Sequence, residues 1–380
     1  MNNKQKHSIS IIGARAYPSN FIGTSGVETY LEKILDCLTK YPNYHFRIYV
    51  KSSYQSHMEK IENPLVQIIP VWTVRSKLFE SLIYSILSSL LAVFDSSHTV
   101  WYHAVGPALF SFIPRLFGKK VVVTVHSLDW QRDKWNGPEK LLFRLAAGCL
   151  FVFPPKIATV SESIQIYLKK NYGIRASYTP PGITMKDTDQ IPQTKTVSKI
   201  IHKPYVLFLG RIVPEKRLEW LIEALAFINK TKVRYRLVIA GGQGNTPAYE
   251  KQLKEQYSDD WITWQGYIFG KPKEALLVHC ACFALPSNLE GTSISLLEAI
   301  GYGKYCVSAK EYTPTDLQTL HNVILFHCSD KQSFFTNLQK ALGLERSHPG
   351  YRYNSRENRI LRKYSWDKTA EIYARLFLKK

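Results

Sequence analysis

Two glutamates that stand eight positions apart have the chemistry needed to bind the hydroxyl groups of a sugar or a ribose. Glu290 lies in a turn rich in glycine, serine and threonine, and Glu298 lies in the helical pattern that follows. Eight positions are slightly more than two helical turns, so both carboxylates project from roughly the same side. Ionised carboxylates only accept hydrogen bonds, which suits hydroxyl groups better than phosphates. Taken alone, the two residues could equally be a turn cap and a solvated helix residue.

The segment that carries these glutamates has the order of elements expected for an anion site. Residues 282–285 read as a buried strand and residues 294–300 as a helix. Between them, Gly291, Thr292 and Ser293 supply backbone N–H groups, at which the dipole of the helix also points. We therefore expect phosphate binding at the turn and hydroxyl binding at the two carboxylates.

A second group of charged residues follows another expected strand, at residues 205–209. Gly210 permits close approach of the backbone to a ligand, and Arg211 and Lys216 can neutralise a diphosphate as it leaves. Solvated surface cations are the alternative interpretation. If these side chains stabilise the departing phosphate, neither a metal ion nor any other cofactor is required.

Polar residues also follow expected strands in the N-terminal half of the chain. His103 and His126 stand at the ends of strands expected at residues 100–103 and 121–125. Ligands of open α/β sheets bind at the carboxyl ends of the strands, although a single histidine is more often structural. Gly26 lies in a loop between the first expected strand and the first expected helix, where it is either a simple turn residue or part of a second phosphate cradle.

Together these motifs resemble the retaining, GT-B-fold glycosyltransferases of glycosyltransferase family 4. The stretch from Pro286 to Gly303 is similar to the family's E-x7-E signature. The resemblance implies that Glu290 meets the transferred sugar and Glu298 the ribose of the nucleotide. It also implies that Arg211 and Lys216 grip the donor pyrophosphate.

Two further segments extend the resemblance into the N-terminal half. The loop at Gly26 is similar to the family's Gly-Gly-x-Glu loop, with Ser25 at the first glycine. Residues 123–135 resemble a bacterial subset that includes rhamnosyltransferases of surface-polysaccharide assembly, with Ser127 in place of a glycine. The resemblance implies that His126 contacts the donor sugar near the reacting centre. The residues that it assigns to the acceptor are His103, Asp129 and Trp130.

Strand and helix patterns alternate twice along the chain, which predicts an α/β protein with two doubly wound sheets. The resemblance makes these the two Rossmann-like domains of a GT-B fold, facing across a cleft. We expect an acceptor-binding domain at residues 1–185, a linker at 186–203 and a nucleotide-sugar-binding domain at 204–360. Residues 361–380 are expected to form a helix that packs back toward the first domain.

The function implied by the resemblance is sugar transfer with retention of configuration. The donor would be a nucleoside-diphosphate sugar, with rhamnose as one candidate sugar, and the acceptor a glycan, preferably lipid-linked, in bacterial surface-polysaccharide synthesis. A nucleotide-sugar epimerase of the same fold and a basic nucleic-acid-binding protein are the alternatives. Nucleic acid is not the expected partner, because carboxylates beside the phosphate site would repel its backbone.

The charge balance favours an anionic partner. The chain has 50 Lys and Arg against 30 Asp and Glu, a net charge of +20. An apolar helix expected at residues 77–94 is too short for a confident membrane span. It is either a core helix or, together with residues 110–117, a surface for anionic lipid; the cations expected beside that surface are Arg75, Lys77, Arg115, Lys119 and Lys120. Six cysteines without zinc-site spacing, and the absence of a signal-peptide pattern, favour a cytoplasmic protein that is peripheral to the membrane if it binds there.

Overall fold

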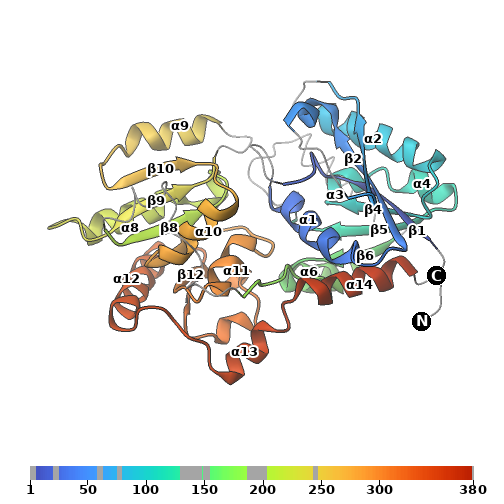
Figure 1. Cartoon of the computed structure of the whole chain (residues 1–380). Helices are drawn as coiled ribbons and strands as arrows, with labels where there is room; N and C mark the ends of the chain where they lie inside the picture. Colours follow the sequence, from blue (N-terminus) through green and yellow to red (C-terminus); the bar gives the residue numbers. More distant parts are fainter. Residues whose placement is uncertain are drawn as a thin grey trace. The chain divides into compact units, whose positions relative to one another are not determined.

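The computed structural model describes residues 6–19, 25–57, 63–74, 79–128, 148, 155–185, 203–242 and 247–378. Asp129, Trp130 and all but the last residue of the expected linker lie outside these ranges. The chain forms two compact units, each built on one parallel sheet (Figure 1). The first unit comprises Met1–Pro181 and Trp366–Lys380, and the second comprises Gly182–Ser365.

The sheet of the first unit has seven strands in the order β3-β2-β1-β4-β5-β6-β7, all parallel. They are β1 (His7–Ile12), β2 (Tyr44–Lys51), β3 (Val66–Val71), β4 (Thr99–His103), β5 (Lys120–Val125), β6 (Lys156–Thr159) and β7 (Ser177–Tyr178). The strand order reverses between β1 and β4. In doubly wound sheets, such a switch point is where ligands bind at the carboxyl ends of the strands.

Helices cover both faces of this sheet. They are α1 (Gly26–Leu38), α2 (Phe79–Phe94), α3 (Val105–Ala108), α4 (Phe112–Leu116), α6 (Glu162–Tyr172) and α14 (Trp366–Leu378). Neighbouring residues of β4 point to opposite faces: the Trp101 ring packs on Tyr373 of α14, and the Tyr102 hydroxyl contacts Ser89 of α2. Burial on both faces explains why β4 and β5 read as continuous apolar runs. The last helix, α14, lies beside α1 in this unit (Figure 1).

The sheet of the second unit has six parallel strands in the order β10-β9-β8-β11-β12-β13. They are β8 (Tyr205–Leu209), β9 (Arg236–Ala240), β10 (Ile262–Gly266), β11 (Cys282–Leu285), β12 (Cys306–Ala309) and β13 (Val323–Phe326). Here the order reverses between β8 and β11. The carboxyl ends of these two strands are the ends that the paired glutamates and the cations follow in sequence.

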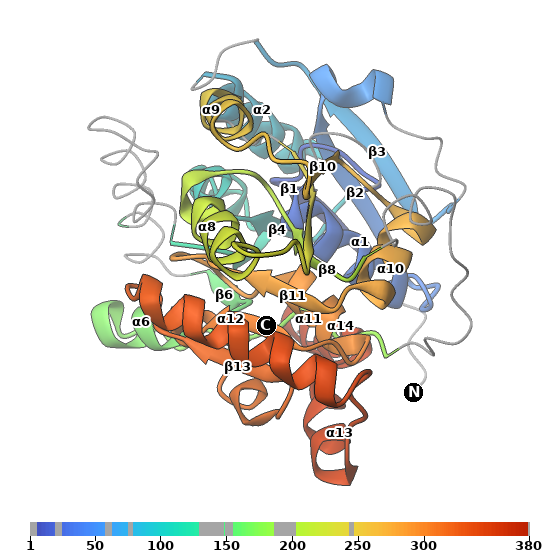
Figure 2. The ribbon, with the colours of Figure 1, turned by 90° about the vertical axis from the view of Figure 1, so that its left-hand side faces the viewer.

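Six α-helices are described in the second unit. They are α8 (Leu218–Ile228), α9 (Pro247–Gln256), α10 (Gly270–His279), α11 (Ile294–Gly301), α12 (Lys331–Ser347) and α13 (Ser355–Leu361). Helix α12 lies along β11, β12 and β13 and beside α8, as two views show (Figures 1 and 2). Phe334 of α12 is fully buried against Phe326 of β13, so the core continues from the sheet into this helix layer.

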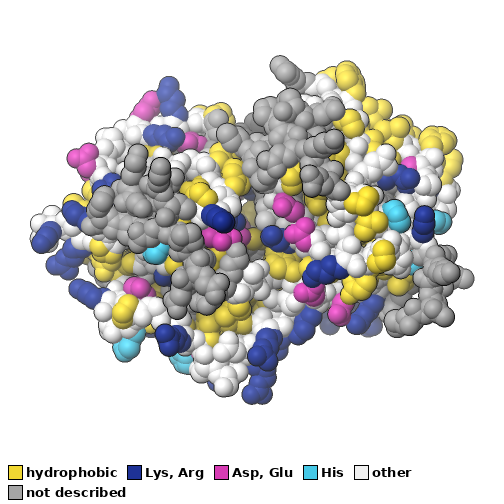
Figure 3. Space-filling view, viewed as in Figure 1, with side chains coloured by type: hydrophobic (Ala, Val, Ile, Leu, Met, Phe, Trp, Pro, Cys, Tyr) yellow, Lys and Arg dark blue, Asp and Glu magenta, His cyan; other side chains and the backbone are white. Residues whose placement is uncertain are grey.

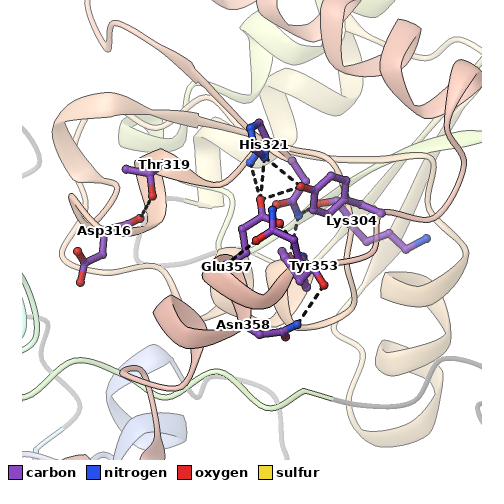
Figure 4. Close-up of polar contacts among 10 residues, drawn as sticks. Lys304, Asp316, Thr319, His321, Tyr353, Glu357 and Asn358 are labelled. Carbon is purple, nitrogen blue, oxygen red and sulfur yellow. Dashed lines mark hydrogen bonds and ion pairs between the residues drawn. The ribbon is translucent and has the colours of Figure 1, made fainter.

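A buried carboxylate fixes the short helix α13 (Figure 4). Glu357 is only 2% exposed and forms a capping box with Asn354, whose backbone N–H donates to it at 3.0 Å. The Tyr351 hydroxyl donates to the same carboxylate at 2.7 Å, and the His321 backbone N–H at 3.2 Å. Burial alone would raise the pKa of Glu357, but these hydrogen bonds lower it below its ordinary value. The ionised carboxylate therefore stabilises this end of the second unit.

Candidate functional site

Lys216 and Glu290 form an ion pair in the second unit. Lys216 ends a short 3-10 helix (Pro214–Lys216) beyond β8, and Glu290 lies in the loop beyond β11. Because β8 and β11 are neighbours in the sheet, residues 74 positions apart meet at its carboxyl edge. The backbone N–H of Asn288 donates to the Glu215 carbonyl at 3.0 Å and holds the two loops together. The paired side chains are only 11% and 15% exposed, so the pair is partly shielded from water.

Glu298 has a lysine partner of its own. It projects from the body of α11, and its carboxylate lies 2.7 Å from the Lys273 ammonium on α10. Lys273 was not among the residues predicted from the sequence, because no motif surrounds it. Lys271 and Lys273 both stand at the start of α10, where the helix dipole opposes a cation, so this position does not single out the lysine that meets Glu298. The two expected carboxylates thus each face a cation from a different element.

The turn between the glutamates begins α11 as expected. Ser293 is the N-cap, and its hydroxyl accepts from the Leu296 N–H at 3.4 Å. The same hydroxyl lies 3.0 Å from that of Ser295. Thr292 is 9% exposed and Gly291 directly follows the paired Glu290. This geometry puts the start of the α11 dipole close behind the Lys216–Glu290 pair, which favours an anion there.

Close backbone packing beside this turn depends on two glycines after β9. A Cβ atom at Gly241, whose φ is +131°, would lie 1.9 Å from the Gly210 carbonyl oxygen. A Cβ atom at Gly242 would lie 2.3 Å from the Tyr267 ring. At Gly210 itself a Cβ atom would meet nothing nearer than 3.8 Å, so that glycine leaves space beside the Lys216 side chain. The strictest demand for glycine therefore falls on Gly241 rather than on Gly210.

The cations of this segment are not equivalent. Arg217 has a left-handed backbone, with φ at +46°, donates to the Cys328 carbonyl and lies 4.4 Å from the centre of the Trp220 ring. It therefore serves to position the start of α8. Arg211 directly follows Gly210 at the end of β8, on the same edge as Lys216. These placements leave Arg211 and Lys216 as the candidates for a phosphate.

Histidines mark the carboxyl edge of the first unit's sheet. His103 Nδ1 lies 3.0 Å from His126 Nε2, which joins the ends of β4 and β5. The edge of the Tyr30 ring meets the His126 ring at a centroid distance of 5.2 Å. Burial lowers the pKa of His126 to about 3. The pKa of His103 is lowered well below its ordinary value, mainly by burial and to a smaller extent by the electrostatic effect of His126. Both imidazoles are therefore neutral at pH 7.

The start of α1 accommodates the serine at position 25 without a special backbone conformation. Gly26 is the first residue of α1, and Ser25 is its N-cap, with an extended backbone at φ −138° that any residue can adopt. Glu28 is 1% exposed and accepts from the backbone N–H groups of Ser25 and Arg15, at 2.8 and 3.0 Å. The serine therefore introduces no backbone strain at this position.

One glycine in the first unit has a structural role that the sequence did not predict. A Cβ atom on Gly13, whose φ is +114°, would lie 2.2 Å from the His103 carbonyl oxygen. Gly13 directly follows β1, so the ends of β1 and β4 approach each other at the switch point of the sheet. A glycine at the end of the first strand was visible in the sequence, but its partner was not. In the ranges that the structure describes, no group of three His, Cys, Asp or Glu side chains is arranged to hold a metal ion.

Two family models match the chain. Residues 24–186 match the model described as Glycosyltransferase Family 4, and residues 191–358 match that described as Glycosyl transferases group 1. Among curated proteins, the chain is similar to a GDP-mannose-dependent alpha-(1-6)-phosphatidylinositol monomannoside mannosyltransferase of Mycobacterium tuberculosis. The identity is 27% over 54% of this chain and 56% of the relative. The chain matches about half or less of the length of its curated relatives.

Solved structures share the fold over almost the whole chain. Sucrose-phosphate synthase from Thermosynechococcus elongatus superposes with a TM-score of 0.77 at 16% identity, covering 98% of both chains. The Anabaena protein HepE, in complex with UDP-glucose, superposes with a TM-score of 0.72 at 14% identity, covering 97% of this chain and 98% of that protein. The predicted fold class, two Rossmann-like units of the GT-B type, is confirmed.

Proposed function

We propose that this chain, a GT-B protein of the glycosyltransferase family 4 type, transfers a sugar from a nucleoside-diphosphate sugar to a glycan acceptor with retention of configuration. The observation that carries the proposal is the Lys216–Glu290 pair at the switch point between β8 and β11. It combines a cation for a phosphate with a carboxylate for a hydroxyl, beside the N-terminus of α11.

The chemistry follows from where charge develops. When the bond from the sugar to the diphosphate breaks, negative charge grows on the leaving phosphate, and Lys216, Arg211 and the N–H groups of the α11 turn stabilise it. Glu290 then orients the sugar by accepting from its hydroxyl groups. Because the leaving phosphate oxygen can itself take the acceptor proton, this route needs no protein nucleophile and no metal ion. His126 contacts the sugar near the reacting carbon.

The nucleotide is proposed to be a ribonucleoside diphosphate. Glu298 is an acceptor of hydrogen bonds and suits the ribose 2′- and 3′-hydroxyls, while Lys273 holds its carboxylate in place. HepE was solved with UDP-glucose, and the mycobacterial relative is described as GDP-mannose-dependent. The resemblance of residues 123–135 to rhamnosyltransferases favours rhamnose as the transferred sugar. Its carrier would then be dTDP, a deoxyribonucleotide that lacks the 2′-hydroxyl.

The acceptor is proposed to be a lipid-linked glycan of a bacterial surface polysaccharide, reached at an anionic membrane face. Large apolar side chains on α2 and α4 are exposed, with Phe94 at 82% and Leu116 at 79%. They belong to a set that comprises Phe79, Leu90, Leu91, Phe94, Phe112, Leu116 and Phe117. Figure 3 shows hydrophobic side chains gathered over the part of the first unit where α2 and α4 lie. No described helix is long and apolar enough to span a bilayer.

Two of the cations expected to face the lipid have other partners. The Lys119 ammonium donates to the carbonyls of Asp95 and Ser97, and that of Lys120 lies 3.4 Å from the Leu378 carbonyl at the end of α14. Arg75 and Lys77 lie outside the described residues. Among the described residues, we therefore propose the exposed apolar side chains of α2 and α4 as the main contact with the membrane. Flotation with anionic vesicles should carry the wild type upward and leave a Phe94→Glu, Leu116→Glu double variant behind; wild type that stays at the bottom would contradict membrane binding.

The transfer itself is tested by release of nucleoside diphosphate. Purified protein is incubated with UDP-glucose, GDP-mannose and dTDP-rhamnose in turn, each with and without a bacterial lipid extract, and the anomeric configuration of the product is read by NMR. We expect one donor to be consumed only when the extract is present, with its configuration retained. Interconversion of sugars without the extract would indicate an epimerase. No turnover of any donor, or the same turnover in Glu290→Gln, would contradict the proposal.

A further inference from the structure

His103 is placed where it can act through another residue. Its side chain is fully buried, whereas His126 is partly exposed. On one side the His103 ring packs against Trp101, with a centroid distance of 4.3 Å, and its Nδ1 atom meets His126 Nε2 at 3.0 Å. The acceptor contact that the resemblance implies for His103 stays a prediction, and a fully buried ring favours a role through the neighbouring His126.

The contact between the two rings allows only two arrangements of protons. Both imidazoles are neutral, and a neutral imidazole carries one proton, on either Nδ1 or Nε2. In the first arrangement, His103 donates from Nδ1 to His126 Nε2, and the proton of His126 is then on Nδ1. In the second arrangement, His126 donates from Nε2, and the proton of His103 is then on its own Nε2.

The surroundings of His103 Nε2 distinguish these arrangements. This atom is buried and has no hydrogen-bond partner among the residues that the structure describes. In the second arrangement it would be a buried N–H without an acceptor, the type of orphan that native structures most strongly avoid. In the first arrangement it is an unprotonated nitrogen in the ring that packs against Trp101, and His126 carries its hydrogen on Nδ1, the nitrogen that does not face His103. The first arrangement is therefore the more stable one.

We propose that His103 is a positioning residue that fixes His126 as the Nδ1–H tautomer, so that His126 presents a hydrogen-bond donor to an oxygen atom of the ligand. The inference rests on the proposed function, in which that ligand is the transferred sugar. A ligand oxygen with a free lone pair, such as a sugar hydroxyl or a ring oxygen, is thereby preferred over a group that can only donate.

The backbone and a tyrosine hold the pair in this geometry. Ala104, next to His103, has φ at 75° and ψ at 159°, a region that only glycine enters without strain, and the Ala104 N–H donates to the Thr124 carbonyl at 2.9 Å. The Tyr30 ring that meets His126 is itself fixed, since its hydroxyl donates to the Thr179 carbonyl at 2.7 Å and contacts the Tyr373 hydroxyl at 3.1 Å. These contacts hold Tyr30 beside the His126 ring, and the described partner of His126 Nε2 is His103 Nδ1.

NMR of the intact protein, labelled with nitrogen-15 in its histidines, measures the tautomer directly. The His126 signals are assigned by their loss in His126→Gln, and long-range couplings then show which ring nitrogen carries the proton. We expect Nδ1–H in the wild type, the opposite of the Nε2–H form that a free histidine side chain prefers. An Nε2–H signal would overturn the inference. Because no substrate is present, this result does not depend on whether the chain is a transferase.

Two variants of equal shape separate positioning from packing. His103→Asn retains an N–H donor near the position of Nδ1, whereas His103→Leu has the same branched shape without a donor. We expect Asn to keep the Nδ1–H signal of His126 and most of the turnover, and Leu to lose that signal and about tenfold in kcat, the size of a lost hydrogen bond. His98→Leu, at the amino end of β4, is the control. Equal loss in Asn and Leu, with both folded by circular dichroism, would also overturn the inference.

Discussion

The ammonium of Lys216 contacts the carboxylate of Glu290, so the cation expected to bind the donor phosphate and the carboxylate expected to bind the donor sugar satisfy each other. Neither group is left as an isolated charge in this partly shielded position. A diphosphate that binds Lys216 must compete with Glu290. The same competition releases the Glu290 carboxylate to accept from a sugar hydroxyl, which couples binding of the two halves of the donor.

This coupling predicts opposite effects of Glu290→Gln on binding and on turnover. Removing the carboxylate frees Lys216 and removes a negative charge near the phosphates, so affinity for nucleoside diphosphate alone should rise, by about 1 kcal/mol or roughly fivefold. Turnover of the nucleotide sugar should fall about a hundredfold or more. Titration calorimetry and an assay of diphosphate release measure the two quantities. Glu255→Gln on exposed α9 is the control; weaker diphosphate binding in Glu290→Gln would contradict the coupling.

The Glu298–Lys273 pair predicts discrimination by the ribose 2′-hydroxyl. Wild-type protein should bind UDP about tenfold or more tightly than 2′-deoxy-UDP, because the deoxy ligand leaves a partly buried carboxylate with an unused acceptor site. In Glu298→Ala the two ligands should bind equally. Competition binding measures the ratio for both proteins. Equal affinities in the wild type would show that Glu298 does not read this hydroxyl.

Glu357 predicts a stability that depends on pH. Its folded pKa lies below the ordinary value of 4.5, so the carboxylate contributes stability above that pH and loses it as the pH falls through the folded value. Glu357→Gln should lower the free energy of unfolding by about 1–3 kcal/mol at pH 7. The difference from wild type should shrink below about pH 4.5. Urea unfolding at pH 7 and pH 4 tests this, and a difference that grows on acidification would contradict it.

Gly241 predicts a strict requirement for glycine beside the donor site. Gly241→Ala places a Cβ atom 1.9 Å from the Gly210 carbonyl oxygen, at a φ that alanine avoids. The substitution should therefore lower the free energy of unfolding by about 2 kcal/mol or more. Gly173→Ala is the matched control, since its φ is +68° and a Cβ atom there meets nothing within 4 Å. It should lose only about 1 kcal/mol. If thermal unfolding shows the same loss of stability in Gly241→Ala and Gly173→Ala, the close approach of Gly241 to the Gly210 carbonyl is unimportant.

The strands of the fold and the turn that carries Glu290 could be predicted from the sequence, because each is marked by residues that are close together in the chain. Apolar runs such as residues 121–125 and 282–285 are strands, and the Glu290-Gly-Thr-Ser turn leads into α11 as predicted. Lys273 was not accessible, because it reaches Glu298 from a separate helix 25 positions earlier and no nearby residue signals the contact. The burial of His103 was hidden for a similar reason, because a residue at the end of a strand has the same sequence context whether or not Tyr30 and Trp101 cover it.

The most direct measurement is the affinity of UDP, GDP and dTDP for the metal-free wild type and for Lys216→Met, with Lys254→Met on α9 as a control that removes an exposed lysine of the same unit. A donor site built on Lys216 predicts that at least one diphosphate binds the wild type and Lys254→Met equally. The same diphosphate should bind Lys216→Met about tenfold or more weakly. Failure of all three to bind the wild type, or unchanged binding in Lys216→Met, would contradict a nucleotide-sugar site at the carboxyl edge of β8 and β11.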